Sequence, residues 1–301
     1  MNKKILKHKR TSSALKFQDS LRLKRVLDDL RGQYHREEFL SSDPLEFVYR
    51  FSDPWDQEAV ALVAALLAYG NVRQIRKSVQ DLISRMVKHS SSPSCYVREL
   101  GAKNRAQAAS RAFDGFVHRF NNGADLFQLL QLLEQSWSKY RSLGAHFSVH
   151  LTPQDKNIST ALALLIQDWR AWAKKGESLG SFSYLLTSPA EGSCCKRWCM
   201  FLRWMGRKDD IDPGLWSESG ILAHTIPKGR WLKTEQLIIP LDTHTGRMSQ
   251  KLGLTSRKSL GWKAAVEVTE SLKRFDPHDP TRYDFSLSRP GILDTFFRSS
   301  R

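Results

Sequence analysis

The sequence lacks the long apolar run of a membrane-spanning helix. Such a helix needs about 18 or more consecutive apolar residues, whereas the longest apolar stretch here, residues 59–69, stops at Gly70. The charged N-terminus, residues 1–13, is not followed by the apolar segment of a secretory signal. We therefore expect a soluble protein located in the cytoplasm, with residues 1–13 forming a flexible basic tail.

Cysteines are also few, and the four present are Cys95, Cys194, Cys195 and Cys199. Three of them fall within six positions, so they do not form the spaced framework of a disulfide-rich protein, and we expect free thiols. Neither the cysteines nor the nine histidines fit the spacings of a zinc site, and glycine-rich phosphate loops and serine nucleophile elbows are absent from the sequence. We therefore expect chemistry without a metal or another cofactor.

Acidic residues are scarce relative to basic ones, with 31 Asp and Glu against 47 Lys and Arg, a formal net charge of +16. A charge of this size favours a polyanionic partner such as a nucleic acid. With 41% hydrophobic and 10% aromatic residues the chain can build a large core, which excludes a wholly disordered protein. The length fits one large domain or two smaller ones.

Helical periodicity dominates the pattern of apolar residues. Asp-Pro pairs at Asp43 and Asp53 are typical of helix starts, and Gly70 with Asn71 separates the second of these helices from a third that begins at Val72. These features predict an all-α protein of ten or more short helices, with a helical hairpin turning at residues 69–71. The predicted helices are 15–35, 43–51, 55–68, 72–86, 124–140, 158–174, 194–206, 262–275, 292–298 and one that begins after Asp242. The one strand-like run is 237–239, and it leads into that helix.

Residues 237–247 combine a short apolar run, a proline and an aspartate that begins a helix. On composition alone, Asp242 is a helix cap that accepts hydrogen bonds from free backbone N–H groups, a contribution of about 0.5–2 kcal/mol. An Asp-Thr-His tripeptide is not by itself a catalytic signature.

The segment Ile239-Pro240-Leu241-Asp242-Thr243-His244-x-x-Arg247 resembles the aspartate motif of the helix-hairpin-helix DNA glycosylase superfamily (HhH-GPD), which includes endonuclease III and the 8-oxoguanine glycosylases. The resemblance implies two helical domains flanking a DNA-binding cleft, with Asp242 as the catalytic carboxylate. Residues 14–54 plus 207–301 would form a discontinuous domain that carries Asp242, and residues 55–206 a helical bundle that carries Asn71 and Lys196.

A longer pattern widens this resemblance. Residues 237–254, together with Phe275-Asp276-Pro277-x-Asp279-Pro280-x-x-Tyr283-Asp284-Phe285, are similar to a bacterial branch described only as a domain of unknown function. This similarity covers most of the chain from about Asp43 onward.

The superfamily also has a nucleophilic lysine at the start of a helix upstream of the aspartate, and Lys196 is the candidate. Gly192-Ser193-Cys194-Cys195-Lys196 resembles the hairpin glycine and lysine of the superfamily, although the usual second glycine is missing. Lys196 precedes Asp242 by 46 positions, and we interpret the polar residues 207–235 between them as an inserted loop, which costs little closure entropy. The alternative for Lys196 is a solvated residue that contacts a phosphate.

At the predicted hairpin, the resemblance implies that Asn71 or Tyr69 fills the gap that an extruded base leaves in the duplex, although an ordinary helix turn uses the same residues. The predicted DNA contacts are Asn71, Tyr69, Arg73, Arg76, Lys77, Arg197, His244 and Arg247. The aromatic candidates for the wall of a base pocket are Trp198, Trp216, Trp231 and Phe285, two of them in the inserted loop.

These features lead to the hypothesis of a monomeric base-excision repair enzyme that acts on double-stranded DNA at the bacterial nucleoid. It would extrude a damaged base, by analogy an oxidised purine, cleave its N-glycosidic bond and open the abasic site through a Schiff base on Lys196. One alternative is a non-catalytic, structure-specific DNA- or RNA-binding protein on the same scaffold. Another is a basic scaffold that binds RNA assemblies through residues 1–13.

Overall fold

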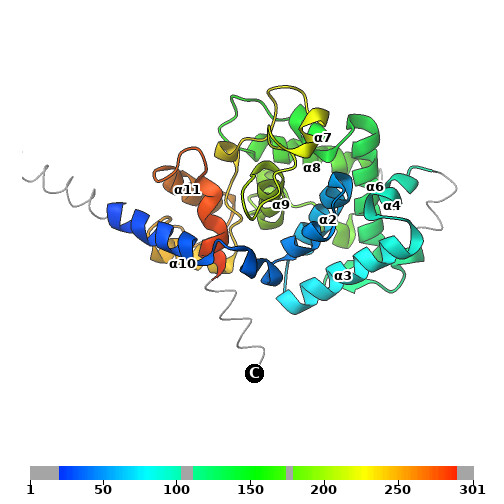
Figure 1. Ribbon diagram of the computed structural model, residues 1–301, viewed down its shortest axis with the longest axis horizontal. Coiled ribbons are helices and arrows are strands. Elements are labelled where there is room, and N and C mark those ends of the chain that lie inside the picture. The colour runs from blue at the N-terminus through cyan, green and yellow to red at the C-terminus, as the bar shows by residue number, and fades with distance from the viewer. Residues whose placement is uncertain (1–19, 103–110, 174–178, 290–301) are drawn as a thin grey trace, which may run out of the picture.

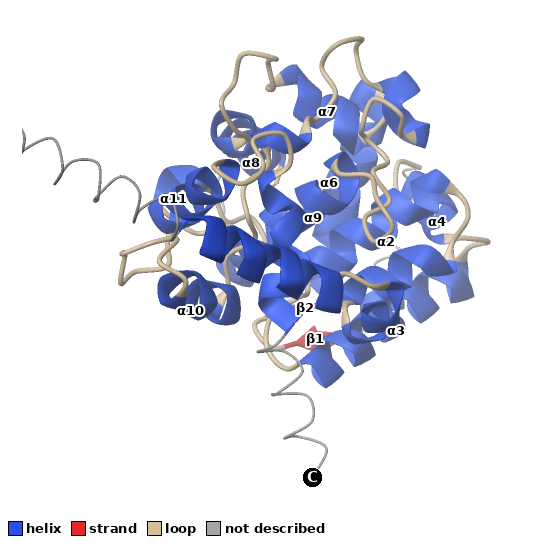
Figure 2. Cartoon of the chain, turned by 60° about the vertical axis from the view of Figure 1, so that its left-hand side comes forward, coloured by secondary structure: helices blue, strands red, loops and turns tan. Residues whose placement is uncertain are grey.

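Helices make up most of the structure, a computed structural model that describes residues 20–102, 111–173 and 179–289. The only sheet within these ranges is an antiparallel hairpin of β1 (Val117–His118) and β2 (Asn121–Asn122), drawn as the two strands of Figure 2. The prediction of an all-α protein is therefore confirmed. None of the helices in the described ranges has the combined length and apolar character that crossing a membrane requires.

The first helices begin where prolines and capping side chains predict them. Asp43 accepts a hydrogen bond from Leu45 N (2.9 Å) and Asp53 from Trp55 N (2.8 Å), and each is followed by a proline at the first helical position. The helix after Asp43 is a 3-10 helix. In this part of the chain residues 20–34 are helical, followed by η1 (Glu37–Ser42), η2 (Pro44–Arg50), α2 (Pro54–Leu66), α3 (Val72–His89), α4 (Pro93–Glu99) and η3 (Arg111–Phe113).

The rest of the chain adds longer helices joined by 3-10 turns. They are α6 (Gly123–Tyr140), α7 (Leu143–Val149), α8 (Ser159–Trp172), η4 (Gly180–Tyr184), η5 (Pro189–Glu191), α9 (Lys196–Gly206), η6 (Ile221–Thr225), η7 (Thr234–Gln236), α10 (Thr243–Lys251), α11 (Trp262–Lys273), η8 (Pro280–Tyr283) and a helical segment at 284–289. The sequence did not predict α4 or α7, because seven residues span only two turns of periodicity. The predicted helix 292–298 and the basic tail lie outside the described residues.

Helix α2 occupies the centre of the molecule, where it packs beside α9 (Figure 1). Every side chain from Ala59 to Leu67 is buried, which is why this helix is apolar on all faces rather than amphipathic. A continuous hydrophobic cluster extends from Leu27 to Leu287 and includes residues of both domains proposed from the sequence. At the other end of the chain, the hydroxyl of Tyr283 contacts Asp28 Oδ1 at 3.0 Å, which places the helix at 20–34 against η8.

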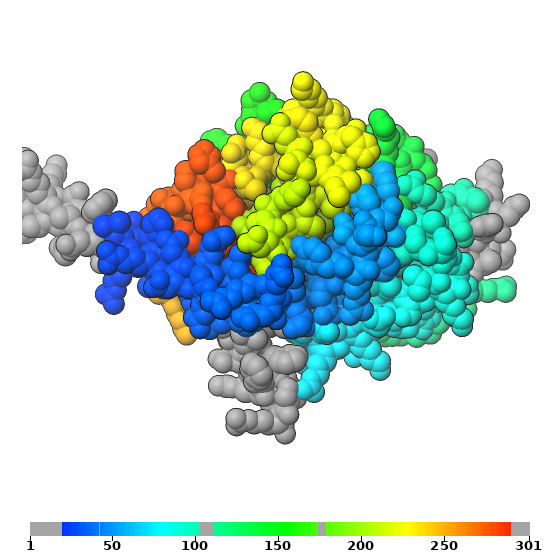
Figure 3. All heavy atoms as spheres, viewed as in Figure 1, coloured from blue at the N-terminus to red at the C-terminus, as the bar shows by residue number. Residues whose placement is uncertain are grey.

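The segment 207–235, interpreted from the sequence as an inserted loop, is irregular but packed. Trp216 is fully buried, and its Nε1 donates a hydrogen bond to Glu58 of α2 at 2.6 Å. Leu215 and Leu222 are buried as well. Figure 3 shows this part of the chain (yellow) as a continuous part of the surface. It therefore contributes to the core instead of projecting from it.

Candidate functional site

A cavity of about 550 Å³ lies where chain segments far apart in the sequence meet. Its lining includes the turn before α3, the beginning of α9, the beginning of α10 and the helical segment at 284–289. Lys196 and Asp242, the two residues that the superfamily resemblance singles out, both line it.

The turn between α2 and α3 forms one side of the cavity, as the predicted helical hairpin requires. Gly70 adopts a φ of 99°, a left-handed conformation that side chains rarely adopt, so the turn favours glycine. Asn71 begins α3, and its Oδ1 accepts a hydrogen bond from Arg73 N at 2.9 Å. Asn71 therefore caps the helix and also faces the cavity.

Tyr69 is held firmly beside this turn. Its hydroxyl lies 2.9 Å from the carbonyl oxygen of His118 and 2.6 Å from Oδ1 of Asn121. Burial raises the pKa of Tyr69 to about 12, so the phenol stays protonated. These contacts fix the ring as a wall of the cavity.

Lys196 is the first residue of α9 and follows a strained turn. Gly192 and Cys195 both have positive φ angles, 76° and 47°, and Cys195 carries a side chain in this left-handed conformation. Lys196 is half-buried, and its Nζ lies 3.4 Å from the carbonyl oxygen of Ala68. Such strain is concentrated at functional sites in proteins, and here it sets the direction in which Lys196 enters the cavity.

Asp242 is the N-cap of α10, as its position before the helix predicts. Its Oδ1 accepts a hydrogen bond from Thr245 N at 2.8 Å. Its other oxygen has no hydrogen-bond partner in the described part of the chain, and the residue lines the cavity. Capping therefore uses one carboxylate oxygen and leaves the other available to a ligand.

Asp284 is a further ionisable residue in the cavity, and sequence reasoning did not single it out. It is 5% exposed, and its Oδ1 has no hydrogen-bond partner among the described residues. Burial raises its pKa to about 6, and the charge of Asp242 acts in the same direction, whereas Arg203 and Lys196 lower it. Asp284 belongs to the quoted motif around Tyr283 and Phe285, but nothing in the sequence pattern indicates its burial.

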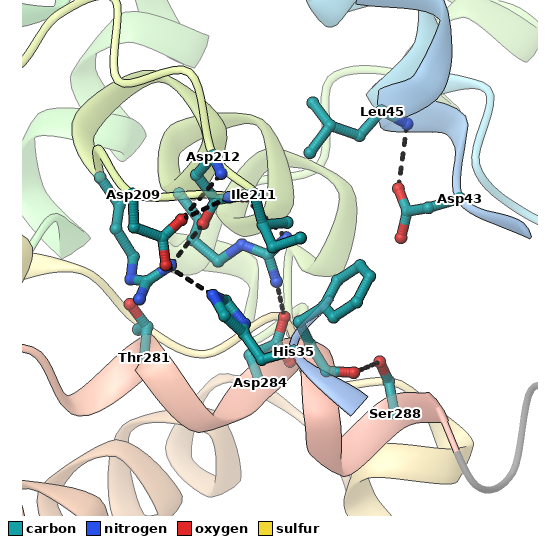
Figure 4. A network of polar contacts seen from close by, with 12 residues as sticks. His35, Asp43, Leu45, Asp209, Ile211, Asp212, Thr281, Asp284 and Ser288 are labelled. Atoms are coloured by element: carbon teal, nitrogen blue, oxygen red, sulfur yellow. Dashed lines mark hydrogen bonds and ion pairs between the residues drawn. The ribbon is translucent and has the colours of Figure 1, made fainter. Parts of the chain in front are cut away.

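A network of buried ion pairs holds Asp284 from behind the cavity. Arg203 bridges Asp284 and Asp212, and Arg207 pairs with Asp212 and Asp209. His35 Nε2 lies 2.6 Å from Asp209 and connects the N-terminal part of the chain to the network. Figure 4 shows Asp209, Asp212 and Asp284 gathered in this way. The network fixes the carboxyl group of Asp284 without using both of its oxygens.

The predicted DNA contacts divide into three groups. Asn71, Tyr69, Arg73 and His244 line the cavity. Lys77 and Arg247 are exposed outside its lining.

The two remaining candidates are engaged within the protein. Arg76 pairs with Glu46 at 2.8 Å and donates to the carbonyl oxygen of Ser41. Arg197 is buried, donates to the carbonyl oxygens of Leu66 and Tyr184, and lies over aromatic rings. The predicted phosphate contact of Arg197 therefore conflicts with its position, because the guanidinium group points into the protein and orders the chain around Tyr184.

Of the aromatic candidates for a base pocket, only Phe285 lines the cavity. Trp198 and Trp216 are fully buried and donate to Leu185 O and to Glu58. Trp231 donates to Ala223 O. The expectation that residues 207–235 shape the pocket is not met, because none of them lines it.

The sequence analysis missed an exposed aromatic surface beside the cavity. Phe120, at the tip of the β1–β2 hairpin, is 59% exposed, and its ring packs against Tyr184 (5.3 Å between centroids) and lies parallel to Tyr69 (6.3 Å). Arg119 lies over the Phe120 ring. A hairpin of two-residue strands has no periodicity that would predict it.

Burial disfavours thiolate chemistry at two of the four cysteines, Cys195 and Cys199. Burial raises the pKa of Cys195 to about 12 and that of Cys199 well above its usual range, so both remain protonated thiols. The four cysteines are free, as expected.

Fold and site together define a helical protein whose cavity is lined by one lysine and three aspartates, of which Asp43 is paired with Arg289. Residues 43–293 match the model of the family described as "Protein of unknown function (DUF2400)", and the chain belongs to this family. No curated protein and no solved structure matches the chain.

Proposed function

We propose that this protein is a DNA glycosylase with abasic-site lyase activity, in which Lys196 is the nucleophile. One observation carries the proposal. Lys196, Asp242 and Asp284 are distant in the sequence but line one cavity, where Asp242 raises and Lys196 lowers the pKa of Asp284. The cavity volume lies within the roughly 300–1,000 Å³ typical of small-molecule sites. It is large enough for an extruded nucleobase with its sugar.

DNA binding in this proposal uses the cavity and the surface around it. A base inside a duplex must be extruded before an enzyme can act on it, at a cost of a few kcal/mol that is least for a damaged base. Arg73 at the mouth and the exposed Lys77 and Arg247 contact phosphates, which offsets this cost. Asn71, exposed at the turn before α3, is the side chain that enters the vacated stack, and Tyr69, whose hydroxyl is held by His118 and Asn121, lines the cavity beside it. Such a role implies a cytoplasmic, nucleoid-associated enzyme that acts as a monomer.

The chemistry follows from the three ionisable groups. The neutral amine of Lys196 attacks C1′ of the extruded nucleotide, and the N-glycosidic bond breaks with its electron pair leaving on the base. Asp284 takes the proton that the amine releases and passes it to the departing base, while Asp242 stabilises the positive charge that develops on the sugar. The C1′–O4′ bond then breaks with its electron pair on O4′, which takes up a proton from water, and this leaves a protonated Schiff base on Lys196. Loss of the C2′ proton to a base then breaks the 3′ C–O bond, with the electron pair leaving on the phosphate.

Borohydride trapping on abasic-site duplex DNA tests this proposal directly. We expect a covalent adduct with the wild-type protein, none with Lys196→Gln, and an undiminished adduct with Lys228→Gln, a matched control at an exposed lysine outside the cavity lining. An adduct that persists in Lys196→Gln would contradict the assignment of the nucleophile.

The variant Asp242→Asn separates catalysis from helix capping. Asparagine caps a helix about as well as aspartate, so we expect the free energy of unfolding to change by less than about 0.5 kcal/mol. Without the charge, single-turnover base release from a panel of damaged duplexes should fall about 100- to 1,000-fold, with duplex affinity within about twofold of the wild type in a filter-binding assay. A parallel loss of stability and activity would show that Asp242 acts only as a cap.

A second candidate function is binding of DNA or RNA without chemistry. The exposed Phe120 and Tyr184 beside the cavity favour it, because aromatic rings with a nearby arginine stack well on unpaired bases. Tight binding of abasic-site DNA without any trapped adduct would support this second candidate over the glycosylase.

A further inference from the structure

Outside the cavity, two histidines and an aspartate meet at the junction of α7 and α8. His146 lies in α7, His150 is the residue that ends it, and Asp168 belongs to α8. Nε2 of His146 is 3.1 Å and Nε2 of His150 is 2.8 Å from the same oxygen, Oδ2 of Asp168. None of the three lines the cavity described above. Figure 1 shows α7 and α8 as neighbours, apart from α3 and α10.

Ser136 and its partners orient the ring of His146. Ser136 Oγ lies 3.1 Å from His146 Nδ1, donates to Leu132 O at 2.8 Å and accepts from Trp169 Nε1 at 2.9 Å. With Nδ1 held at Ser136, the other ring nitrogen, Nε2, is directed at Oδ2 of Asp168, 3.1 Å away.

The ring of His146 lies within an aromatic stack, and only its Nε2 edge faces the other two side chains of the group. The His146 side chain is fully buried and lies nearly parallel to the rings of Tyr140 (4.2 Å) and Trp172 (4.9 Å). The ammonium group of Lys139 already lies over both of these rings. At this edge Nε2 of His146, Nε2 of His150 and the carboxylate of Asp168 converge. The side chains of His150 and Asp168, 17% and 35% exposed, leave that edge open to water.

We propose that His146 Nε2, His150 Nε2 and a carboxylate oxygen of Asp168 bind one divalent transition-metal ion of the zinc class. The three ligand atoms lie within 4.8 Å of one another, and they form the only such group of three among the described residues. Imidazole nitrogens with a carboxylate suit Zn²⁺ or Co²⁺ better than Mg²⁺ or Ca²⁺. Ser136 orients the His146 ring by the bond to Nδ1, as partners of metal-binding histidines commonly do. Water completes the coordination, and the ion joins α7 to α8.

The site departs from the expectation of a protein without a metal. Histidines four positions apart on one helix turn are a known ligand spacing, but the third ligand follows His150 by 18 positions on another helix. A search for paired Cys and His motifs does not find such a set.

Metal titration of the full-length, metal-depleted protein tests the site. We expect one equivalent of Co²⁺ to produce a visible absorption band, Zn²⁺ to displace it, and Zn²⁺ to raise the melting temperature. His150→Gln and Asp168→Asn change partly exposed ligands rather than the buried His146, and each should weaken Zn²⁺ binding at least tenfold by calorimetry. His224→Gln, at an exposed histidine that contacts Ile221 O, is the matched control and should bind as the wild type does.

Circular dichroism and the melting temperature without metal show whether each variant is folded. Absence of Co²⁺ and Zn²⁺ binding by the wild type would overturn the proposal, as would binding that is unchanged in folded His150→Gln and Asp168→Asn. The test does not depend on DNA, so its result is independent of the glycosylase proposal.

Discussion

Two buried carboxyl groups serve different purposes in this molecule. Glu58, in the core, is fully buried and accepts hydrogen bonds from two indole N–H groups, Trp137 (2.5 Å) and Trp216 (2.6 Å), and from the backbone of Leu143 and Gly144 (3.3 Å each). Asp284, at the cavity, has one oxygen paired with Arg203 and the other without a partner among the described residues.

Burial raises the pKa of both groups, so a shifted pKa alone does not distinguish them. The difference lies in the unused hydrogen-bonding capacity. Glu58 satisfies four donors and joins α2, α6, α7 and the segment 207–235 into one core, which leaves no oxygen for a ligand. Asp284 keeps an oxygen that faces a cavity, which is the arrangement expected of an acid–base group.

The largest expected effect comes from removing the core carboxyl group. In Glu58→Met the side chain retains its approximate volume, but four N–H donors lose their acceptor in a site that water does not reach. We expect the free energy of unfolding to fall by about 4 kcal/mol in urea denaturation. Glu58→Gln, which keeps one acceptor oxygen, should lose clearly less. Equal stability of Glu58→Met and the wild type would remove the distinction between the two carboxyl groups.

A smaller change in stability, this time an increase, is expected when Asp284 at the cavity is replaced. The unfolded chain loses the Asp284 proton near pH 3.8 and the folded protein near pH 6, so between these values the folded state holds the proton and rising pH favours unfolding. Asp284→Asn removes this dependence. Its stability relative to the wild type should therefore increase by up to about 3 kcal/mol between pH 4 and pH 7, measured by urea unfolding at each pH.

If the protein is the proposed glycosylase, Asp284→Asn should also slow base release. Base release by the wild type should decline as pH falls below about 6, because Asp284 must be ionised to accept a proton. Asp284→Asn should be about 100-fold slower at pH 7 and lack this decline. A variant that is both less stable and fully active would place Asp284 with Glu58 among purely structural groups.

The smallest change in stability is expected from substitutions of Asn71, at the mouth of the cavity. Asn71→Ala removes the cap of α3 and should cost about 1 kcal/mol of stability, whereas Asn71→Ser keeps a capping oxygen and should cost less than about 0.5 kcal/mol. Thermal unfolding of both variants checks this difference. If Asn71 also enters the duplex, Asn71→Ser should still slow base release, and an unchanged rate would limit Asn71 to capping.

Local features of the fold were predictable from the sequence because they depend on neighbouring residues. The Asp-Pro helix starts, the turn at Gly70 and the cap at Asp242 each require only a few adjacent side chains, and all are present. The superfamily resemblance also singled out Lys196 and Asp242, which share a cavity. Whether they perform chemistry stays a prediction.

The features that the sequence did not predict depend on contacts between segments that are distant in the chain. Asp284 acquires its environment from Arg203 and Asp212, and Trp216 becomes a core residue because Glu58 accepts its N–H. The position of Arg197 was predicted wrongly for the same reason. Its charge suggested a surface position, but its N–H groups donate to the carbonyl oxygens of Leu66 and Tyr184.

The ion pair between Asp43 and Arg289 joins residues 246 positions apart, and Asp43 both caps η2 and lines the cavity. Contacts so distant in sequence form only after the intervening chain is ordered, because loop closure must precede them. We therefore expect this wall of the cavity to be completed late in folding. If the protein acts on DNA as proposed, a chain in which this wall is still open would lack the assembled acid–base groups, so its capacity for chemistry should appear later in folding than its affinity for nucleic acid.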